Sequence, residues 1–113
     1  MGQNVWVKCG TVRNLFEEPG ATATGVSDFK YKDSPGATYH ATVTGTGAVT
    51  ATIAIEMSND GVNALETVAG TITLSGTTSS TDGFATDAAW KYVRANVIAL
   101  TGTGATVQVY MGT

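Results

Sequence analysis

The sequence predicts an all-β protein: an antiparallel β-sandwich or jelly roll of about seven or eight strands with an irregular N-terminal arm. Three observations support this fold class. Thr, Ala and Gly are abundant, while the strong helix formers Leu, Glu and Lys are scattered, so long helices are not expected. Apolar and polar residues alternate through much of residues 37–113. The pentapeptide Thr-Gly-Thr-Gly-Ala occurs at Thr44–Ala48 and again at Thr101–Ala105, each time between alternating stretches.

Residues 1–36 form the predicted arm or edge region. Val5–Val7 is a short strand candidate, and Glu17–Gly20 has the composition of a turn. Val26–Tyr31 alternates weakly and is a further strand candidate. Asp33–Gly36 is a strong turn signal, because Pro fixes φ and Gly accepts positive φ.

Residues 37–113 carry the predicted core of what we expect to be a single domain, since 113 residues support one hydrophobic core and not two. Alternation predicts strands at 37–44, 50–57, 71–74, 90–100 and 105–111. The segment 62–69 is interpreted as a bent strand in preference to a helical turn, and 76–83 as a polar loop.

The two pentapeptides are interpreted as the turns of two β-hairpins. When the turns are aligned, the apolar faces of the following strands are out of phase by one residue, which reverses every side chain. Either one hairpin contains a β-bulge or the turns match by convergence. We prefer convergence, and the two copies do not establish an internal duplication.

The distribution of charge argues against nucleic-acid binding. Residues 34–90 contain no Lys or Arg, and the formal net charge is −3, whereas nucleic-acid surfaces need clustered cations. Arg94 is one of few cations in the second half of the chain, so we expect it to pair with Glu56 or Glu66.

No apolar run approaches the roughly 18 residues of a membrane-spanning helix, so no membrane partner is expected. The single cysteine, Cys9, cannot form an internal disulfide, and the first residues lack the pattern of a secretory signal. We therefore expect folding in a cytoplasm, after which a virus particle assembled there could carry the protein elsewhere.

No catalytic or metal-binding constellation is evident. His40 lies on the Thr face of a predicted strand, where a structural role is favoured, and Cys9 is interpreted as a small side chain despite the neighbouring Lys8. Asp82 and Asp87 could offer oxygen ligands to calcium, but their spacing is not that of an EF-hand loop, so solvated acids are expected. The prediction is a protein without enzymatic activity or cofactor.

Aromatic residues are the candidate partner-binding residues. Trp6, Phe16 and Phe29 lie in the irregular region, where they either anchor a protein interface or cap the ends of the sandwich. Trp90 and Tyr92 belong to a strong predicted strand and are interpreted as core or edge packing.

Four segments resemble small β-sandwich proteins of tailed-bacteriophage virions: Ser58–Gly61, Ile72–Gly76, Trp90–Val97 and Gly102–Val109. The resemblance covers residues 37–113. It implies a structural, non-enzymatic virion protein that forms homo-oligomers and contacts the major capsid protein or another virion protein. The resemblance implies no catalytic residue in this sequence.

The resulting expectation is a capsid decoration protein located in the virion, with residues 1–36 contacting the capsid or an adjacent copy. A tail or neck component is the alternative. A second alternative is a carbohydrate-binding module that stacks sugars on aromatic side chains, for which the strand aromatics are the candidates: Tyr39, Trp90, Tyr92 and Tyr110.

Overall fold

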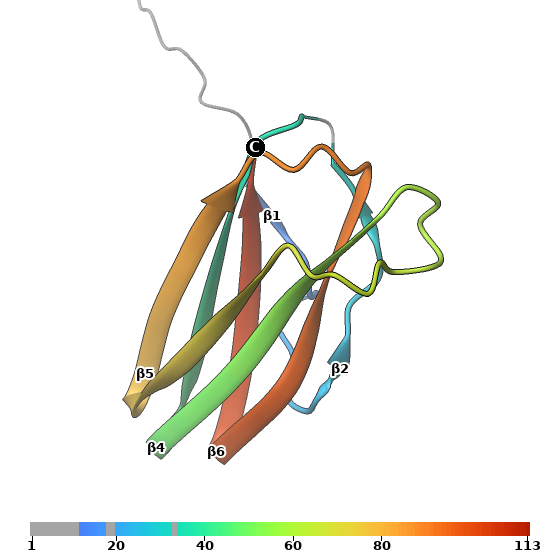
Figure 1. Ribbon diagram of the computed structural model, residues 1–113. Coiled ribbons are helices and arrows are strands. Elements are labelled where there is room, and N and C mark those ends of the chain that lie inside the picture. Colours follow the sequence, from blue (N-terminus) through green and yellow to red (C-terminus); the bar gives the residue numbers. More distant parts are fainter. Residues whose placement is uncertain (1–11, 18–19, 33) are drawn as a thin grey trace, which may run out of the picture.

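The computed structural model describes residues 12–17, 20–32 and 34–113. Within these residues the protein is all-β, and its strands form one antiparallel sheet without any helix (Figure 1). The strands are β1 (Val12–Asn14), β2 (Gly25–Val26), β3 (Lys30–Tyr31), β4 (Ala37–Ser58), β5 (Gly70–Thr86) and β6 (Tyr92–Gly112). The all-β, antiparallel prediction is confirmed.

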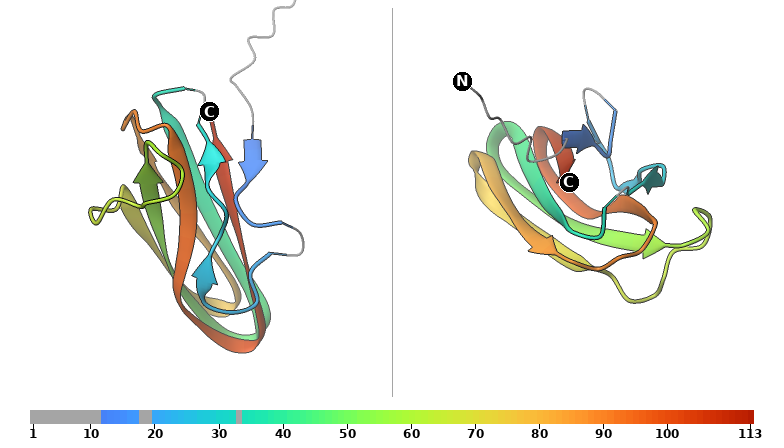
Figure 2. Two further views of the ribbon diagram at one scale, coloured as in Figure 1. Left: turned by 90° about the vertical axis from the view of Figure 1, so that its right-hand side faces the viewer. Right: turned by 90° about the horizontal axis from the view of Figure 1, so that it is seen from above.

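Three long strands, β4, β5 and β6, make up most of the sheet. The strand order is β1-β6-β4-β5, with β2 and β3 also pairing with β6. Each long strand bends sharply near its middle, so the sheet folds over and its two halves face each other (Figures 1 and 2). Because the halves belong to one hydrogen-bonded sheet, the prediction of a sandwich or jelly roll is not confirmed.

Both pentapeptides lie at these bends, so their interpretation as hairpin turns is wrong. The two halves of β4 do not pair with each other. Instead, residues 38–44 pair with 106–112 of β6, and residues 50–58 pair with 92–101. The two pentapeptides lie side by side, with Thr46 opposite Thr103. This explains why the structure has fewer and longer strands than predicted.

The glycines of the two pentapeptides have matching local roles. A Cβ added at Gly45 or at Gly102 would lie 2.8 Å from Cγ1 of Val49, so the first glycine of each copy permits close packing. The second glycines, Gly47 and Gly104, have φ of 73° and 63°, a region that L side chains rarely adopt. In both copies, which lie on adjacent strands, the first glycine therefore allows close packing and the second adopts a positive φ.

Alternation in the sequence predicts Val93, Ala95, Val97 and Ala99 on one inner face of β6, and the structure buries the first three of them. The pairing with β4 skips Ile98, which forms a β-bulge and is exposed. Beyond the bulge the alternation is reversed: Ala99 is exposed, although it was predicted to face inward, and Leu100 packs against the core.

Two segments between strands also differ from prediction. Residues 62–69 form a loop rather than a bent strand, and the predicted polar loop 76–83 belongs to β5. The polar run continues as a strand because its backbone pairs with β4, from Gly76 opposite Val49 to Gly83 opposite His40, with an irregularity at the bend. Polar side chains are compatible with an edge strand whose outer face meets solvent.

The described part of the predicted arm lies along the edge of β6. The Leu15 N–H donates to the Val109 carbonyl oxygen (2.8 Å), and the Ser27 N–H donates to that of Ala95 (2.8 Å). Leu15 is buried in the core. Deleting residues 1–36 would therefore remove core packing as well as any partner contact.

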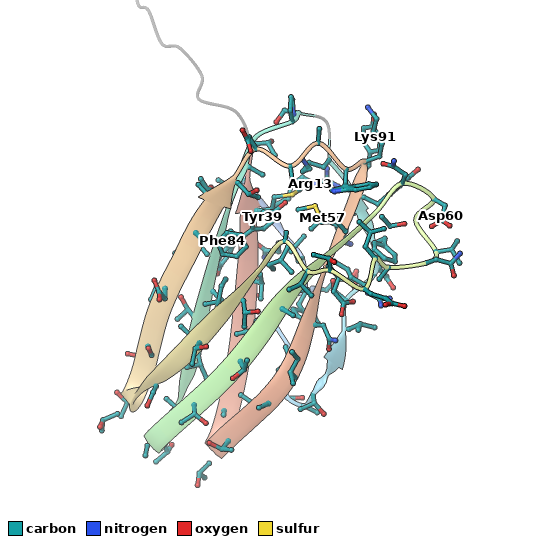
Figure 3. All side chains as sticks on the ribbon, viewed as in Figure 1. Arg13, Tyr39, Met57, Asp60, Phe84 and Lys91 are labelled. Carbon is teal, nitrogen blue, oxygen red and sulfur yellow. The ribbon has the colours of Figure 1, made fainter. Side chains whose placement is uncertain are left out.

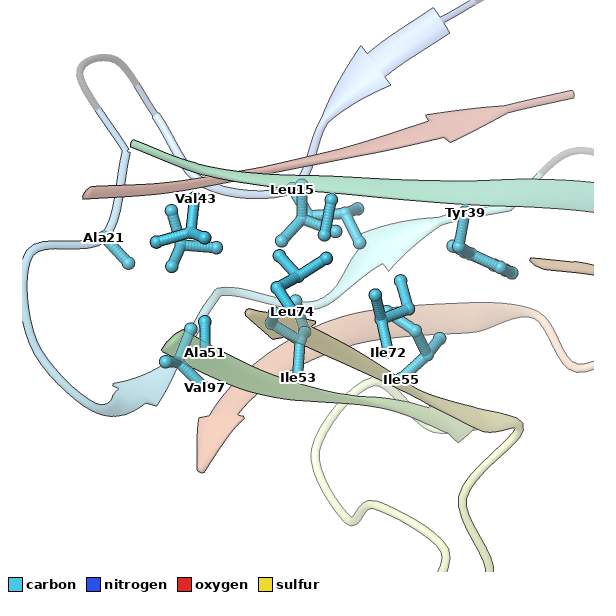
Figure 4. Close-up of a cluster of buried hydrophobic side chains, with 14 of the residues drawn as sticks. Leu15, Ala21, Tyr39, Val43, Ala51, Ile53, Ile55, Ile72, Leu74 and Val97 are labelled. Atoms are coloured by element: carbon cyan, nitrogen blue, oxygen red, sulfur yellow. The ribbon is translucent and has the colours of Figure 1, made fainter. Parts of the chain in front are cut away.

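The core fills the space between the two halves of the sheet (Figure 4). Side chains from one half, including Val43 and Tyr39, face Ile53 and Leu74 from the other. The Tyr39 ring packs against Phe84, with 5.4 Å between ring centroids. The Tyr39 hydroxyl is buried without a hydrogen-bond partner among the described residues.

Candidate protein-interaction surface

Three loops gather at the end of the sheet opposite the bends (Figures 1 and 3). They are residues 32 and 34–36, which precede β4, residues 59–69 between β4 and β5, and residues 87–91 between β5 and β6. The bends bring them together, because each long strand folds back so that both of its ends lie at the same end of the molecule (Figure 1). Loop ends of rigid sheets are frequent binding sites.

Trp90 stands between two hollows at this end. The larger hollow, about 260 Å³, is mostly apolar, whereas the smaller one, about 110 Å³, is partly polar. Trp90 lines both and is 38% exposed. We call the hollows together with Tyr31, Val68, Trp90 and Lys91 the Trp90 surface. The remaining residues of the larger hollow are Met57, Leu65, Thr67, Ala69, Thr86 and Ala88.

Tyr31 is held in place by aromatic packing although half of its surface is exposed. Its ring meets Tyr92 edge to face, with 5.7 Å between centroids. Tyr92 in turn packs over Gly61, where an added Cβ would lie 3.4 Å from its ring. The exposed aromatic surface therefore rests on a rigid support, which reduces the entropy lost when a partner binds.

Lys32 ties two of the loops together. Its buried ammonium group donates to the carbonyl oxygens of Ser34 (3.1 Å), Pro35 (2.7 Å) and Ala88 (2.5 Å). Burial, and secondarily the positive charge of Lys91, lowers the pKa of Lys32. These bonds fix the wall of the smaller hollow.

Asp60 organises the loop between β4 and β5. Its Oδ1 accepts from the backbone N–H groups of Val62 and Asn63 (both 2.8 Å) and from the Ser58 hydroxyl (2.7 Å). These bonds, led by the Asn63 backbone N–H, hold the pKa of Asp60 far below its usual range. The loop is thus ordered by hydrogen bonds from its own residues.

Of the two partners predicted for Arg94, Glu56 and Glu66, the structure shows Glu56, with 2.6 Å between Nε and Oε1. Asn96 Nδ2 donates to the second carboxylate oxygen (3.0 Å). The guanidinium also lies 4.7 Å from the centre of the Phe29 ring. The choice of Glu56 over Glu66 follows from the register, because Glu56 lies directly opposite Arg94.

The predicted partner-binding residues are not gathered at one site. Trp6 lies outside the described residues. Phe16 is partly buried and packs against the core, and Phe29 is partly covered by Arg94. Trp90 was interpreted as strand packing, but β6 begins only at Tyr92. The lack of alternation in Ala88-Ala89-Trp90 was the available signal for a loop.

No group of three or more His, Cys, Asp or Glu side chains within the described residues is placed to hold a metal ion. His40 lies on the outer face, where Nε2 is 3.4 Å from the Thr42 hydroxyl and the ring packs against Tyr110. The described segments also contain no helix long and apolar enough to cross a membrane.

Together these features define an all-β protein built from one bent antiparallel sheet with a partly apolar loop end. A solved structure of similar fold is the SPBc2 prophage-derived protein YomS, with a TM-score of 0.55 and 15% sequence identity. The match covers 97% of this chain and 100% of that chain. At this identity the likeness shows a shared fold. No protein-family model and no curated protein matches the sequence.

Proposed function

We propose that this chain is a non-enzymatic structural protein of a tailed-phage particle, which decorates and stabilises the capsid surface through protein–protein contacts. The observation that carries the proposal is the fold shared over nearly the whole chain with a complete chain of prophage origin. The segments that resemble small virion β-proteins agree with this assignment.

The Trp90 surface is the contact region that we propose for the virion partner. Exposed Trp and Tyr side chains beside an apolar hollow are the features that dominate the binding energy of protein interfaces. Trp90 fits this description because it is 38% exposed and borders the larger, apolar hollow. Lys32 and Asp60 hold the surrounding loops, so the surface is preformed.

The carbohydrate-binding alternative has less support from the positions of the strand aromatics. Tyr39 is buried in the core. Tyr92 packs between Tyr31 and Gly61 at the loop end, whereas Tyr110 packs against His40 on the outer face of the other half of the sheet. They do not form one platform for stacking sugars. A tail or neck location remains the alternative within the same functional class.

The test is co-sedimentation of the purified protein with phage particles assembled without it. We expect binding to the particles and a loss of about 30-fold in affinity for W90A, the effect typical of a hot-spot residue. I98A is the matched control, because Ile98 is an exposed apolar side chain on β6 outside the Trp90 surface. Thermal unfolding of each variant verifies its fold.

Equal binding of W90A and wild type would exclude the Trp90 surface as the contact region. Absence of the protein from purified particles by mass spectrometry, together with selective binding on a glycan array, would replace the virion role with the carbohydrate role. Electron microscopy of labelled protein on particles distinguishes the capsid from the tail or neck.

A further inference from the structure

The two edges of the sheet differ in how far other described residues cover them. The edge at β6 is covered by residues 12–17 and 20–32, which hydrogen-bond to it at intervals. The edge at β5 pairs only with β4 among the described residues. An open strand edge presents unpaired N–H and C=O groups that can join another strand.

The register determines which backbone groups of β5 face outward. In an antiparallel ladder, successive residues point their N–H and C=O groups alternately to either side. The Ser75 N–H donates to the Ser80 hydroxyl (3.3 Å), and therefore points away from β4. Thr73 and Thr71, two and four residues earlier, consequently direct their backbone groups outward as well.

Parts of this edge are already blocked by side chains. The Ser80 hydroxyl accepts from Ser75, and the Asp82 carboxylate accepts from the Gly83 N–H (2.8 Å). No comparable bond from a described residue reaches Thr71 or Thr73. Residues 67–81 also contain no charged residue and no Pro, the usual devices that prevent edge pairing.

We propose that a second copy of this chain pairs with this edge, antiparallel, with a two-fold axis at Ile72. In that register Thr71 of each copy lies opposite Thr73 of the other, and the outward backbone groups of both are satisfied. The contact is self-complementary, as a two-fold interface requires. Thr–Thr pairs on the outer face stabilise such a ladder, and the uncharged segment brings no like charges together.

The dimer rests on backbone hydrogen bonds more than on apolar burial, because Ile72 and Leu74 are already buried within one copy. It should therefore dissociate on dilution. This inference is independent of the proposed function, since particle binding uses the loop end and the dimer is measured on the isolated protein.

The test is sedimentation velocity of the full chain over a concentration series. We expect a monomer–dimer equilibrium for wild type and for T73V, which keeps the backbone N–H and the side-chain shape. T73P removes the outward N–H without removing a bond to β4, and T73K places like charges across the axis. Both should reduce the association constant at least tenfold.

A99K is the matched control, because Ala99 lies in the same cross-strand row as Thr73, on the outer face but in β6. It should leave the dimer intact, and thermal unfolding verifies that each variant is folded. A monomer at every concentration would overturn the proposal. So would a dimer that T73K and T73P leave unchanged, or one that A99K weakens as much as T73K does.

Discussion

Replacing Tyr39 by Phe should stabilise the protein. The Tyr39 side chain is 1% exposed, and no described residue forms a hydrogen bond with its hydroxyl. A buried hydroxyl that loses its bond to water without gaining another costs about 1–3 kcal/mol. Phe keeps the ring packed against Phe84 and removes this cost. We expect Y39F to raise the free energy of unfolding by about 1 kcal/mol at pH 8, or roughly 4 °C in Tm.

The same burial makes the effect depend on pH. Burial raises the pKa of Tyr39 from 10.0 to about 12. As the pH rises, the tyrosine ionises first in the unfolded state, because its pKa is lower there. The free energy of unfolding is therefore unaffected below the unfolded pKa and falls as the pH rises toward the folded pKa. The pH window is therefore 10 to about 12. By pH 11 the free energy of unfolding of the wild type falls by about 1.4 kcal/mol relative to that of Y39F. Above the window the fall is at most about 2.7 kcal/mol.

The assay is urea-induced unfolding of wild type and Y39F at pH 8 and pH 11, with Y110F as a control for the loss of a tyrosine hydroxyl on the outer face. We expect Y39F to be more stable at both values, with the larger difference at pH 11. A variant less stable than wild type at pH 8, or a difference that does not grow with pH, would refute the reasoning.

Two further predictions concern the bends of the long strands. G45A should lower the free energy of unfolding by about 2 kcal/mol, because its Cβ would lie 3.0 Å from the Thr103 carbonyl oxygen. G47A has open space around its Cβ but a positive φ, and should lower it by about 1 kcal/mol. Chemical denaturation that gives the reverse order would contradict these roles. Thr78 is a β-branched residue with φ of 66°, so T78G should raise Tm by a few degrees, and a lowered Tm in a thermal scan would argue against relief of strain there.

Local alternation predicted both halves of β4 and most of β6, because one face of these segments is buried. It also indicated that Arg94 pairs with Glu56 or Glu66, but the choice of Glu56 depends on the strand register. It did not distinguish a hairpin from a bend. Both need glycines with unusual backbone angles, and the difference lies in which distant strand each half joins. For Thr44–Ala48 that partner lies in the second pentapeptide, where Thr103 is opposite Thr46.

The interaction surface was less accessible to sequence reasoning than the strands were. Phe16 and Phe29 were candidates because their neighbourhood lacks regular alternation, yet both are partly covered by contacts with distant residues. Trp90 was assigned to a strand because Val93 and Ala95 follow in good alternation. Its exposure depends on how three loops meet, and no local pattern encodes that arrangement.

The Trp90 side chain and the outward backbone groups of Thr71 and Thr73 belong to different residues, which gives the two proposals a joint consequence. A two-fold dimer through Thr71 and Thr73 carries two Trp90 surfaces, and a repetitive particle can bind both at once. The second contact then forms at a high effective concentration, so modest single contacts suffice for stable attachment. W90A would weaken every contact, whereas T73K would leave each contact intact and remove only the gain from pairing. Comparing the particle affinities of the two variants therefore separates the affinity of a single Trp90 surface from the gain in affinity that dimerisation provides.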